Sequence, residues 1–399
     1  MATPKPTLEM LRALTDENVL RALMAEPRLT RAEIAARTGI SKPTISDSVQ
    51  RLSAAGLLVD TGERTTGRGR VGSYYALAPH LGAALVVTVT QHRVTAQTVD
   101  ALGRVRGRED LALGPGAGAR AAAAALAGVA GRLAERTPGG LRTAVVSAAD
   151  PVDRGTGRLV RLPDAPFLIG DLDPPAALAA HVTGTVHVDN DVNWAARAEH
   201  AAGHARGTDD FVYLHLGEGL GGAVVGDGSV RRGHHGFAGE IAHVWTVGPD
   251  GTAMPLTEVF AALGLRKPDS TAIDVTALRT RLTPGEAGAD ATRTALARAI
   301  GPVLEAAVAF ADPRMIVLGG AWGPDLADPV AERLARSPRP VPVTAATLTD
   351  PELTGARTRA VDELRRLVVE LTRPADRTRH PPATPHPRPT THHRTQDAP

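Results

Sequence analysis

Between residues 29 and 60, apolar positions recur with a helical period that is interrupted once, which predicts two short helices joined by a tight turn. Thr30 can cap the first helix, whose apolar positions Ile34 and Ala35 face inward, and Gly39 supplies the turn. This order of cap, turn and second helix is typical of a helix-turn-helix. An ordinary helical hairpin carries the same signals, so this segment alone leaves both interpretations open.

The second predicted helix carries the side chains that we expect to contact DNA. Pro43 lies in its first turn, where the missing N–H costs nothing. Its inward positions are Ile45, Val49 and Leu52, so its other polar side chains are left to face a DNA groove or solvent. The predicted DNA-binding residues of this helix are Ser41, which also caps it, Lys42, Thr44, Ser46, Ser48 and Arg51.

The residues that follow predict a β-hairpin with a basic loop. Residues 57–60 and 73–77 have strand character, and the loop between them holds Arg64, Arg68 and Arg70 among glycines. Guanidinium groups on such a loop suit a narrow minor groove, which has a negative potential. A solvated loop without a ligand is the alternative. A helix-turn-helix followed by a hairpin is a winged helix, which favours DNA binding by both parts.

From about residue 81 the chain alternates strands rich in Val and Ala with longer helices, which is typical of an α/β protein. Residues 83–110 predict a strand, a tight turn and a returning strand, and residues 211–216 and 221–225 predict a hairpin around the sequence GEGLG. The other predicted elements are strands at 143–147, 185–188, 315–318 and 341–344 and helices at 119–136, 287–311 and 356–372.

Composition limits the remaining possibilities. The chain has 399 residues, enough for two or three domains, and its net charge is only +2. Residues 1–80 contain 11 Lys and Arg against 8 Asp and Glu, so DNA binding is inferred from the placement of charge and not from its sum. The absence of cysteine excludes disulfides and cysteine zinc sites. The N-terminus has no apolar signal core and no 18-residue apolar run follows, so we expect a cytoplasmic protein without membrane contact.

Three longer motifs carry a resemblance to a known family. They are VHVDNDVNWAARAEH at 186–200, LHLGEGLGGAVVGDGSVRRGHHGFAGEIAH at 214–243 and ADPRMIVLGGAWG at 311–323. With the winged helix before them, they make residues 8–372 resemble the ROK family of sugar-responsive repressors, open reading frames and sugar kinases. Tight hairpins need glycine whatever their function, so the glycine run followed by Gly-Glu and a histidine is the specific element.

The resemblance implies an α/β fold with an N-terminal winged helix-turn-helix, residues 1–80, and an actin-like or ribonuclease H-like two-lobed effector domain, residues 81–372. It also implies a homodimer or homotetramer on a double-stranded DNA operator. Residues 373–399 are rich in Pro, Arg and His, contain no aliphatic side chain larger than alanine, and are expected to form a disordered tail.

The resemblance also implies a sugar pocket. Asn190 and Asp191 match an Asn-Asp pair that binds sugar hydroxyls, and the aspartate is the catalytic base in the family's kinases. The pair equally fits a helix cap, which is compatible with sugar contact. Glu240 and His243 match a sugar-contacting Glu and His at the same three-residue spacing. They would share one face if that stretch is helical, although His243 also fits an ordinary surface histidine. Glu258 falls where a further sugar-binding glutamate lies in the family.

Departures from the family pattern separate regulator from kinase. The kinases carry an Asp-Gly-Thr phosphate loop where this chain has residues 88–92, TVTQH, without a carboxylate for a metal or a glycine for phosphate approach. The family's zinc cysteines are absent from residues 244–264, and a Pro-Gly loop near the sugar is replaced by residues 148–151. We therefore expect no cofactor, no metal and no kinase activity.

The sequence thus predicts a transcriptional regulator, expected to be a repressor, that responds to a sugar or sugar derivative. Two alternatives remain open. One is an ATP-dependent sugar kinase of the ROK type, in which Asp191 would be catalytic. The other is a regulator that has lost sugar binding.

Overall fold

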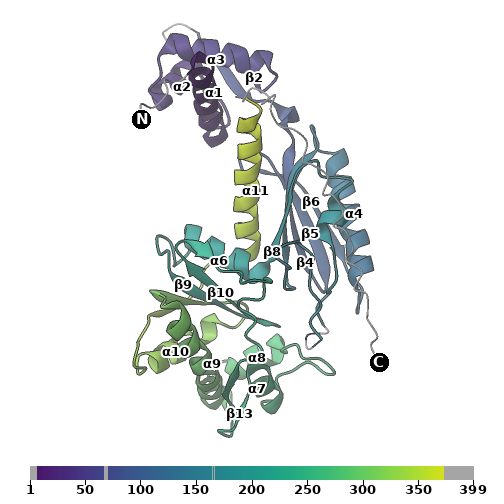
Figure 1. The fold of residues 1–399 in the computed structure, drawn as a ribbon, viewed down its shortest axis with the longest axis vertical. Helices are drawn as coiled ribbons and strands as arrows, with labels where there is room; N and C mark the ends of the chain where they lie inside the picture. The colour runs from purple at the N-terminus through teal and green to yellow at the C-terminus, as the bar shows by residue number, and fades with distance from the viewer. Residues whose placement is uncertain (1–6, 67–70, 164, 166, 373–399) are drawn as a thin grey trace, which may run out of the picture.

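The computed structural model describes residues 7–66, 71–163, 165 and 167–372. The expected tail at 373–399 and the wing residues Arg68 and Arg70 therefore lie outside the described residues. Figure 1 shows an N-terminal domain at one end of the molecule, a first lobe that contains α4 and a second lobe that contains α9 and α10. The long helix α11 (Pro351–Glu370) runs from α6 (Asp191–Ala202) in the middle of the molecule to the N-terminal domain.

The N-terminal domain is a winged helix-turn-helix, as the sequence predicted. Its strands form a small antiparallel sheet in the order β1-β3-β2, and its helices pack on that sheet. Its elements are α1 (Leu8–Ala25), β1 (Leu29–Thr30), α2 (Arg31–Thr38), α3 (Lys42–Ala54), β2 (Leu58–Arg64) and β3 (Ser73–Leu77).

Local capping sets the angle between the two central helices. The Thr30 side chain accepts a hydrogen bond from the Glu33 N–H, and the Glu33 carboxylate accepts one from the Thr30 N–H, which completes a capping box at the start of α2. Gly39 ends α2 with φ 69°, a left-handed conformation that favours glycine. The Ser41 side chain accepts from the Thr44 N–H and caps α3. The turn is therefore encoded by residues within it.

One residue of α3 corrects the expected DNA-facing set. Ser48 is fully buried and donates to the Asp16 carboxylate of α1 at 2.5 Å, so it faces α1 and not a groove. A buried carboxylate on a neighbouring helix requires such donors. Arg51 forms an ion pair with the same carboxylate at 2.6 Å, but its side chain is 36% exposed, and its contact with DNA stays a prediction.

The effector domain begins after a short 3-10 turn (Pro79–Leu81). The first lobe is a five-stranded mixed sheet in the order β6-β5-β4-β7-β8, in which β4, β7 and β8 are parallel. Its elements are β4 (Ala83–Thr90), β5 (Arg93–Val99), β6 (Val105–Ala112), α4 (Ala119–Glu135), β7 (Leu141–Ala148), α5 (Pro174–Leu178) and β8 (Val186–Asn190).

The alternation of side chains along the central strands gives this sheet two buried faces. Leu85 and Val87 of β4 pack with Leu126 of α4, whereas Ala84 and Val86 pack with the residues of α11. Helices cover both faces of this sheet, so nearly every side chain of β4 is buried. This explains its nearly continuous apolar run, which is typical of a strand between two helical layers.

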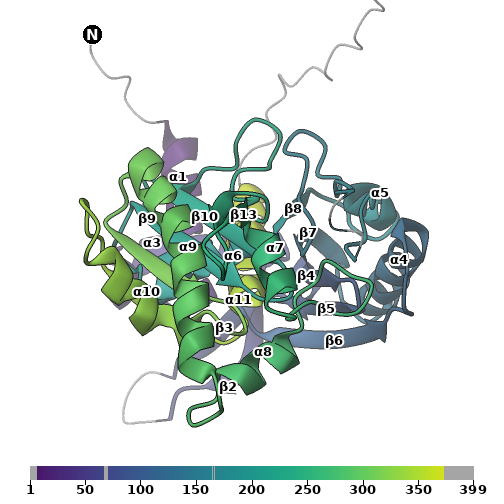
Figure 2. The same ribbon diagram turned by 90° about the horizontal axis from the view of Figure 1, so that it is seen from below.

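The second lobe is a five-stranded sheet in the order β11-β10-β9-β14-β15, with β9, β14 and β15 parallel. In Figure 2 its helices α9 and α10 lie on the side of the molecule away from α4, and its helices α7 and α8 lie nearer the middle. Its elements are β9 (Phe211–Leu216), β10 (Leu220–Gly226), β11 (Ser229–Val230), β12 (Trp245–Val247), β13 (Ala253–Pro255), α7 (Leu256–Ala262), α8 (Val275–Leu282), α9 (Ala289–Ala311), β14 (Met315–Gly319), a 3-10 turn (Pro324–Leu326), α10 (Ala327–Leu334) and β15 (Val343–Ala345).

Among the described residues, α9 is the one helix long and apolar enough to cross a membrane by length and composition, and 44% of its most apolar window is buried in the protein. Leu296, Ile300 and Leu304 of α9 belong to the core of the second lobe. A long helix in a protein core meets the same criterion of length and apolar composition as a helix that spans a membrane.

The differences from the predicted elements have local causes. The returning strand after β4 is followed by a third strand, β6, whose side chains are mostly exposed and so carry no apolar pattern. The Asp100 carboxylate accepts from the N–H groups of Leu102 and Arg104 in the turn between them. The last helix begins at Pro351, five residues before the predicted start, because a proline is favoured in a first turn.

Replacing Asp16 tests the inward placement of α3. Asp16→Ala removes the acceptor of both Ser48 and Arg51, and we expect the α1–α3 contact to weaken by about 1–3 kcal/mol. Hydrogen exchange of the α3 amides measures this as faster local opening.

Glu17→Ala is the matched control. Glu17 pairs with the exposed Arg21 at 2.7 Å within α1, so its loss is expected to cost less than about 0.5 kcal/mol. Equal exchange rates in the two variants would contradict the structural role of Asp16.

Candidate functional site

A pocket of about 360 Å³ lies between the two lobes of the effector domain. The first lobe contributes an apolar wall, formed by Ala149, Leu162, Ala165, Phe167 and Leu168, and the β9–β10 loop faces it from the second lobe. Its volume is within the range of small-molecule sites. The predicted residues that line it are Asn190, Asp191, Glu240 and His243.

Asn190 and Asp191 lie where β8 ends and α6 begins. The Asn190 side-chain oxygen, Oδ1, accepts from the Val192 N–H at 2.9 Å and caps α6, and its side-chain nitrogen, Nδ2, donates to the Asp150 backbone carbonyl oxygen at 3.2 Å. An Asp191 carboxylate oxygen also accepts from the Val192 N–H at 2.8 Å. The expected helix cap is thus present, and both residues also line the pocket.

Burial changes the acidity of two carboxyl groups at this junction. Burial raises the pKa of Asp191 to about 6. Burial, with a smaller contribution from the Asp191 charge, also raises the pKa of Asp150 to about 6, although hydrogen bonds from the Gly170 and Ile169 N–H groups oppose this. One Asp150 oxygen accepts from the Gly170 N–H at 2.6 Å, and the other has no hydrogen-bond partner within the described part of the chain.

Glu240 and His243 reach the pocket from a turn and not from a helix. The condition under which they would share one helical face, a helix over this stretch, is therefore not met. Gly239 precedes them with φ 101°, and a Cβ there would lie 1.8 Å from the Gly222 carbonyl oxygen. This close approach, with a hydrogen bond from the Gly222 N–H to the Gly239 carbonyl oxygen at 2.9 Å, brings the turn over the β9–β10 loop.

Glu258 lies outside the pocket, which corrects its expected role. It is 49% exposed and pairs with Arg266 at 2.9 Å. Its neighbours Val259 and Phe260 point into the core of the second lobe, so the outer face of α7 carries Glu258, while Thr257 lines the pocket.

The first-lobe turn after β4 is joined to the second lobe by a polar bridge. Gln91 donates to a Glu218 carboxylate oxygen at 2.6 Å, and the His92 ring lies 3.6 Å from the same oxygen. Lys267 forms an ion pair with the other oxygen. We call Gln91, His92, Glu218 and Lys267 the inter-lobe bridge. Their roles were not predicted from the sequence, because Gln91 and Glu218 are 127 residues apart.

The predicted DNA-contacting surface is partly available. Ser41, Lys42 and Thr44 are exposed at the start of α3, and Ser46 is half-buried. Arg64 is exposed at the end of β2 and pairs with Asp60 at 2.9 Å. Ser41, Lys42 and Thr44 thus offer polar side chains at the start of α3, and Arg64 lies at the end of β2.

Within the described ranges, no group of three or more His, Asp or Glu side chains is placed to hold a metal ion. Glu240 and His243 line the pocket from the same turn. The other carboxylates in the described part of the pocket wall, those of Asp191 and Glu218, come from other elements.

Comparison with known proteins identifies the two parts of the chain. The sequence profile of winged helix-turn-helix DNA-binding domains matches residues 12–59. The profile of the ROK family matches residues 125–337, more than half of the chain. The chain belongs to the ROK family. Its fold class, a winged helix-turn-helix followed by an actin-like two-lobed α/β domain, is confirmed by these matches and by the solved structure described next.

One solved structure of a ROK family transcriptional regulator, a homolog of the E. coli MLC protein, covers 90% of this chain and 99% of its own chain with a TM-score of 0.62 at 17% identity. Among curated proteins, a glucokinase of Halalkalibacterium halodurans is 44% identical over 68 residues, and a xylose repressor of Caldicellulosiruptor bescii is 40% identical over 58 residues. These matches cover 17% and 14% of this chain and span 20% of the length of that glucokinase and 14% of the length of that repressor.

The raised pKa of Asp150 predicts a pH-dependent stability. The folded protein releases this proton near pH 6 and the unfolded chain near the ordinary value of 3.8, so the folded state binds more protons between these values and stability falls as the pH rises. Asp150→Asn keeps the acceptor for Gly170 and removes the charge. We expect unfolding monitored by circular dichroism to give a variant more stable than wild type at pH 7.5, by up to roughly 3 kcal/mol, and no such gain at pH 4.

Asp153→Asn is the control with the opposite sign. Hydrogen bonds from Thr156 lower the pKa of Asp153, so its charged form favours the folded state, and its removal is expected to give no gain at pH 7.5. Equal gains in both variants would contradict the assignment to Asp150.

Proposed function

We propose that this protein is a DNA-binding transcriptional regulator, expected to be a repressor, whose binding to an operator is controlled by a sugar or sugar derivative in the inter-lobe pocket. The observation that carries this proposal is the joining of a winged helix-turn-helix to a ROK domain through one shared apolar core. In it the DNA-binding part and the pocket-bearing part are packed together, as a coupled regulator requires.

The chemistry of the pocket supports a polyol ligand. A carboxylate accepts hydrogen bonds from hydroxyl groups, and an amide both donates and accepts. One cavity holds these groups on Asn190, Asp191, Glu240 and His243, beside the apolar wall that contains Leu162, Phe167 and Leu168. The names of the similar glucokinase and xylose repressor both concern sugars, which favours the same ligand class here.

The inter-lobe bridge supports a regulator over a kinase. Residues 88–92 correspond to the phosphate loop of the family's kinases, and here their turn contacts the Glu218 carboxylate. A phosphate placed at this turn would meet a negative charge in place of a metal or a backbone cradle. We therefore propose that the protein acts without a cofactor or metal and transfers no phosphate, and that it works in the cytoplasm.

A contiguous set of contacts supports coupling between the pocket and the DNA. Asn190 caps α6, and α6 packs on α11. Arg365 of α11 donates to the Met24 carbonyl oxygen of α1 at 3.1 Å and to the Ala101 carbonyl oxygen at 2.8 Å. A ligand that favours one position of α6 would thereby change the placement of the N-terminal domain, provided that it binds the two arrangements with unequal affinity.

We further propose that the protein acts as a homodimer or homotetramer. Two copies of α3 would then contact half-sites about one helical turn of DNA apart. A change in their spacing would lower operator affinity without any change in the DNA-contacting residues.

Substitutions on the exposed start of α3 test the DNA surface. A DNA fragment selected from random sequence by the wild-type protein serves as the probe in electrophoretic mobility assays. We expect Lys42→Ala to bind it at least tenfold more weakly and to reduce the dependence of log affinity on log salt by about one.

Arg336→Ala is the matched control, since Arg336 is exposed in the second lobe after α10. It removes one positive charge far from α3, and its affinity should equal that of wild type. Equal losses in both variants would indicate nonspecific charge effects and contradict the assigned surface.

A thermal-shift screen of hexoses, pentoses and N-acetylated sugars tests the pocket. A sugar present at a hundred times its Kd is expected to stabilise the wild-type protein by about 2.7 kcal/mol. Asp191→Asn keeps an oxygen acceptor for the Val192 N–H but loses the charge that a hydroxyl would bind, so the shift should be lost while DNA binding is kept.

Two results would contradict this assignment. If no sugar in the screen stabilises the protein, the alternative of a regulator that has lost sugar binding is favoured. ATP consumption with a sugar, abolished by Asp191→Asn in a coupled assay, would favour the kinase.

A further inference from the structure

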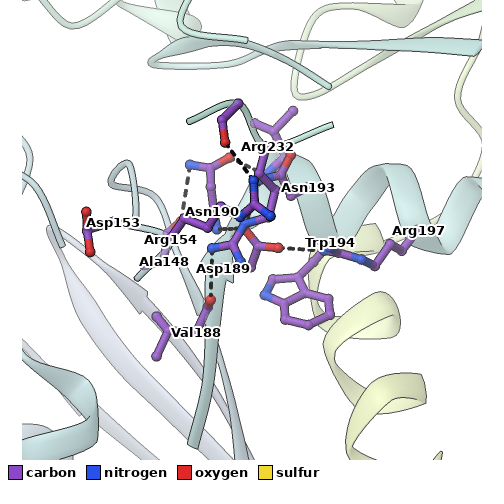
Figure 3. A network of polar contacts seen from close by, with 12 residues as sticks. Ala148, Asp153, Arg154, Val188, Asp189, Asn190, Asn193, Trp194, Arg197 and Arg232 are labelled. Atoms are coloured by element: carbon purple, nitrogen blue, oxygen red, sulfur yellow. Dashed lines mark hydrogen bonds and ion pairs between the residues drawn. The ribbon is translucent and has the colours of Figure 1, made fainter. Parts of the chain in front are cut away.

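A second cavity, of about 420 Å³, lies next to β8 and is lined by arginines from four separate segments. One comes from the loop after β7, one from α6, one from the segment after β11 and one from α11. They are Arg154, Arg197, Arg232 and Arg359. Figure 3 shows the first three close to Asp189 and Asn190. Four guanidinium groups that line one cavity give it a positive potential, which favours an anionic ligand.

In the described part of the chain a single carboxylate lines this cavity, that of Asp189, and its oxygens already accept from three side chains. Asp189 is 2% exposed. It pairs with Arg197 at 2.8 Å and with Arg232 at 3.2 Å, and it also accepts from Asn193 at 2.8 Å. One negative charge is thus shared between two arginines, which leaves an excess of positive charge.

The other two arginines are less satisfied. Arg154 donates to the Gly233 carbonyl oxygen at 3.2 Å and has no ion pair with any described residue. Arg359 reaches Glu363 only at 3.5 Å, and that carboxylate also accepts a hydrogen bond from Arg366 at 2.5 Å.

The nearest further acid does not neutralise them. Asp153 accepts hydrogen bonds from the N–H groups of Gly155 and Thr156 and from the Thr156 hydroxyl, within its own turn. Figure 3 shows it set apart from the guanidinium groups.

We propose that this cavity is a binding site for a phosphate group, carried by a phosphorylated small molecule. Guanidinium groups match the geometry of phosphate oxygens and bind them in pairs, and a phosphate has enough oxygens to accept from several arginines at once. A volume of about 420 Å³ exceeds that of a phosphate ion and is within the range of small-molecule sites.

The position of this site gives it a consequence for the rest of the molecule. Asp189 lines the phosphate cavity, and the next residue, Asn190, lines the inter-lobe pocket. Arg197 belongs to α6 and Arg359 to α11, so a phosphate held by both would connect these two helices directly. The site itself stands on the arginine geometry and does not depend on the proposed sugar or DNA functions.

Isothermal titration calorimetry of the full chain with inorganic pyrophosphate tests the proposal, with ionic strength held constant by NaCl. We expect saturable binding by the wild-type protein and at least tenfold weaker binding by the double variant Arg154→Gln, Arg359→Gln. These two side chains are exposed and leave the Asp189 network intact, so the variant should unfold at the wild-type temperature.

Arg158→Gln is the matched control. Arg158 lies in the same loop as Arg154, is exposed, and approaches Asp173 at 3.8 Å without lining the cavity. Its affinity for pyrophosphate should equal that of wild type.

A second control separates this cavity from the DNA-contacting surface, which also carries arginine. Arg64→Gln should leave pyrophosphate binding unchanged. The proposal is overturned by absence of saturable binding, by unchanged affinity in the double variant, or by a loss in Arg64→Gln that equals the loss in the double variant.

Discussion

The packing of α11 against one face of the first-lobe sheet is the contact on which the rest of the structure depends. Ala360 and Leu364 of α11 lie in the same apolar core as Val86 of β4 and as Leu20 and Leu23 of α1. The last helix of the described chain therefore completes both the sheet and the N-terminal domain. Separating the two parts would expose this shared core to water, which makes their relative placement an energetic property of the whole chain.

The same helix also brings the pocket into this core. Gly355 of α11 approaches the Trp194 carbonyl oxygen of α6 so closely that a Cβ would lie 2.1 Å from it. The Trp194 indole donates to the Val146 carbonyl oxygen of β7 at 3.1 Å, which fixes α6 on the sheet. A backbone contact of this kind has little freedom to slide, so under the proposed coupling a displacement at the start of α6 would pass to α11.

Sequence reasoning succeeded where the signal was local. The caps at Thr30 and Ser41 and the hairpin that follows them indicated the winged helix, whereas the two lobes were expected from the resemblance of the longer motifs. It missed α1, because Leu11 and Leu14 are exposed and blur its apolar stripe, and it misplaced Ser48, whose buried partner lies 32 residues away. The pocket residues at β8 and after Gly239 came from motifs, whereas the inter-lobe bridge depends on contacts between distant segments, which no local pattern encodes.

The inter-lobe bridge also explains how the pocket can be shaped without a nucleotide. Gln91 from the first lobe and Lys267 from the second both bind Glu218, so charge-assisted hydrogen bonds join the lobes on the side where residues 88–92 turn. These bonds form in the protein alone. A ligand bound beside Asp191, as proposed above, would meet two lobes already held at one edge. Its binding energy would then be available to distinguish arrangements at the other edge, where α6 meets α11.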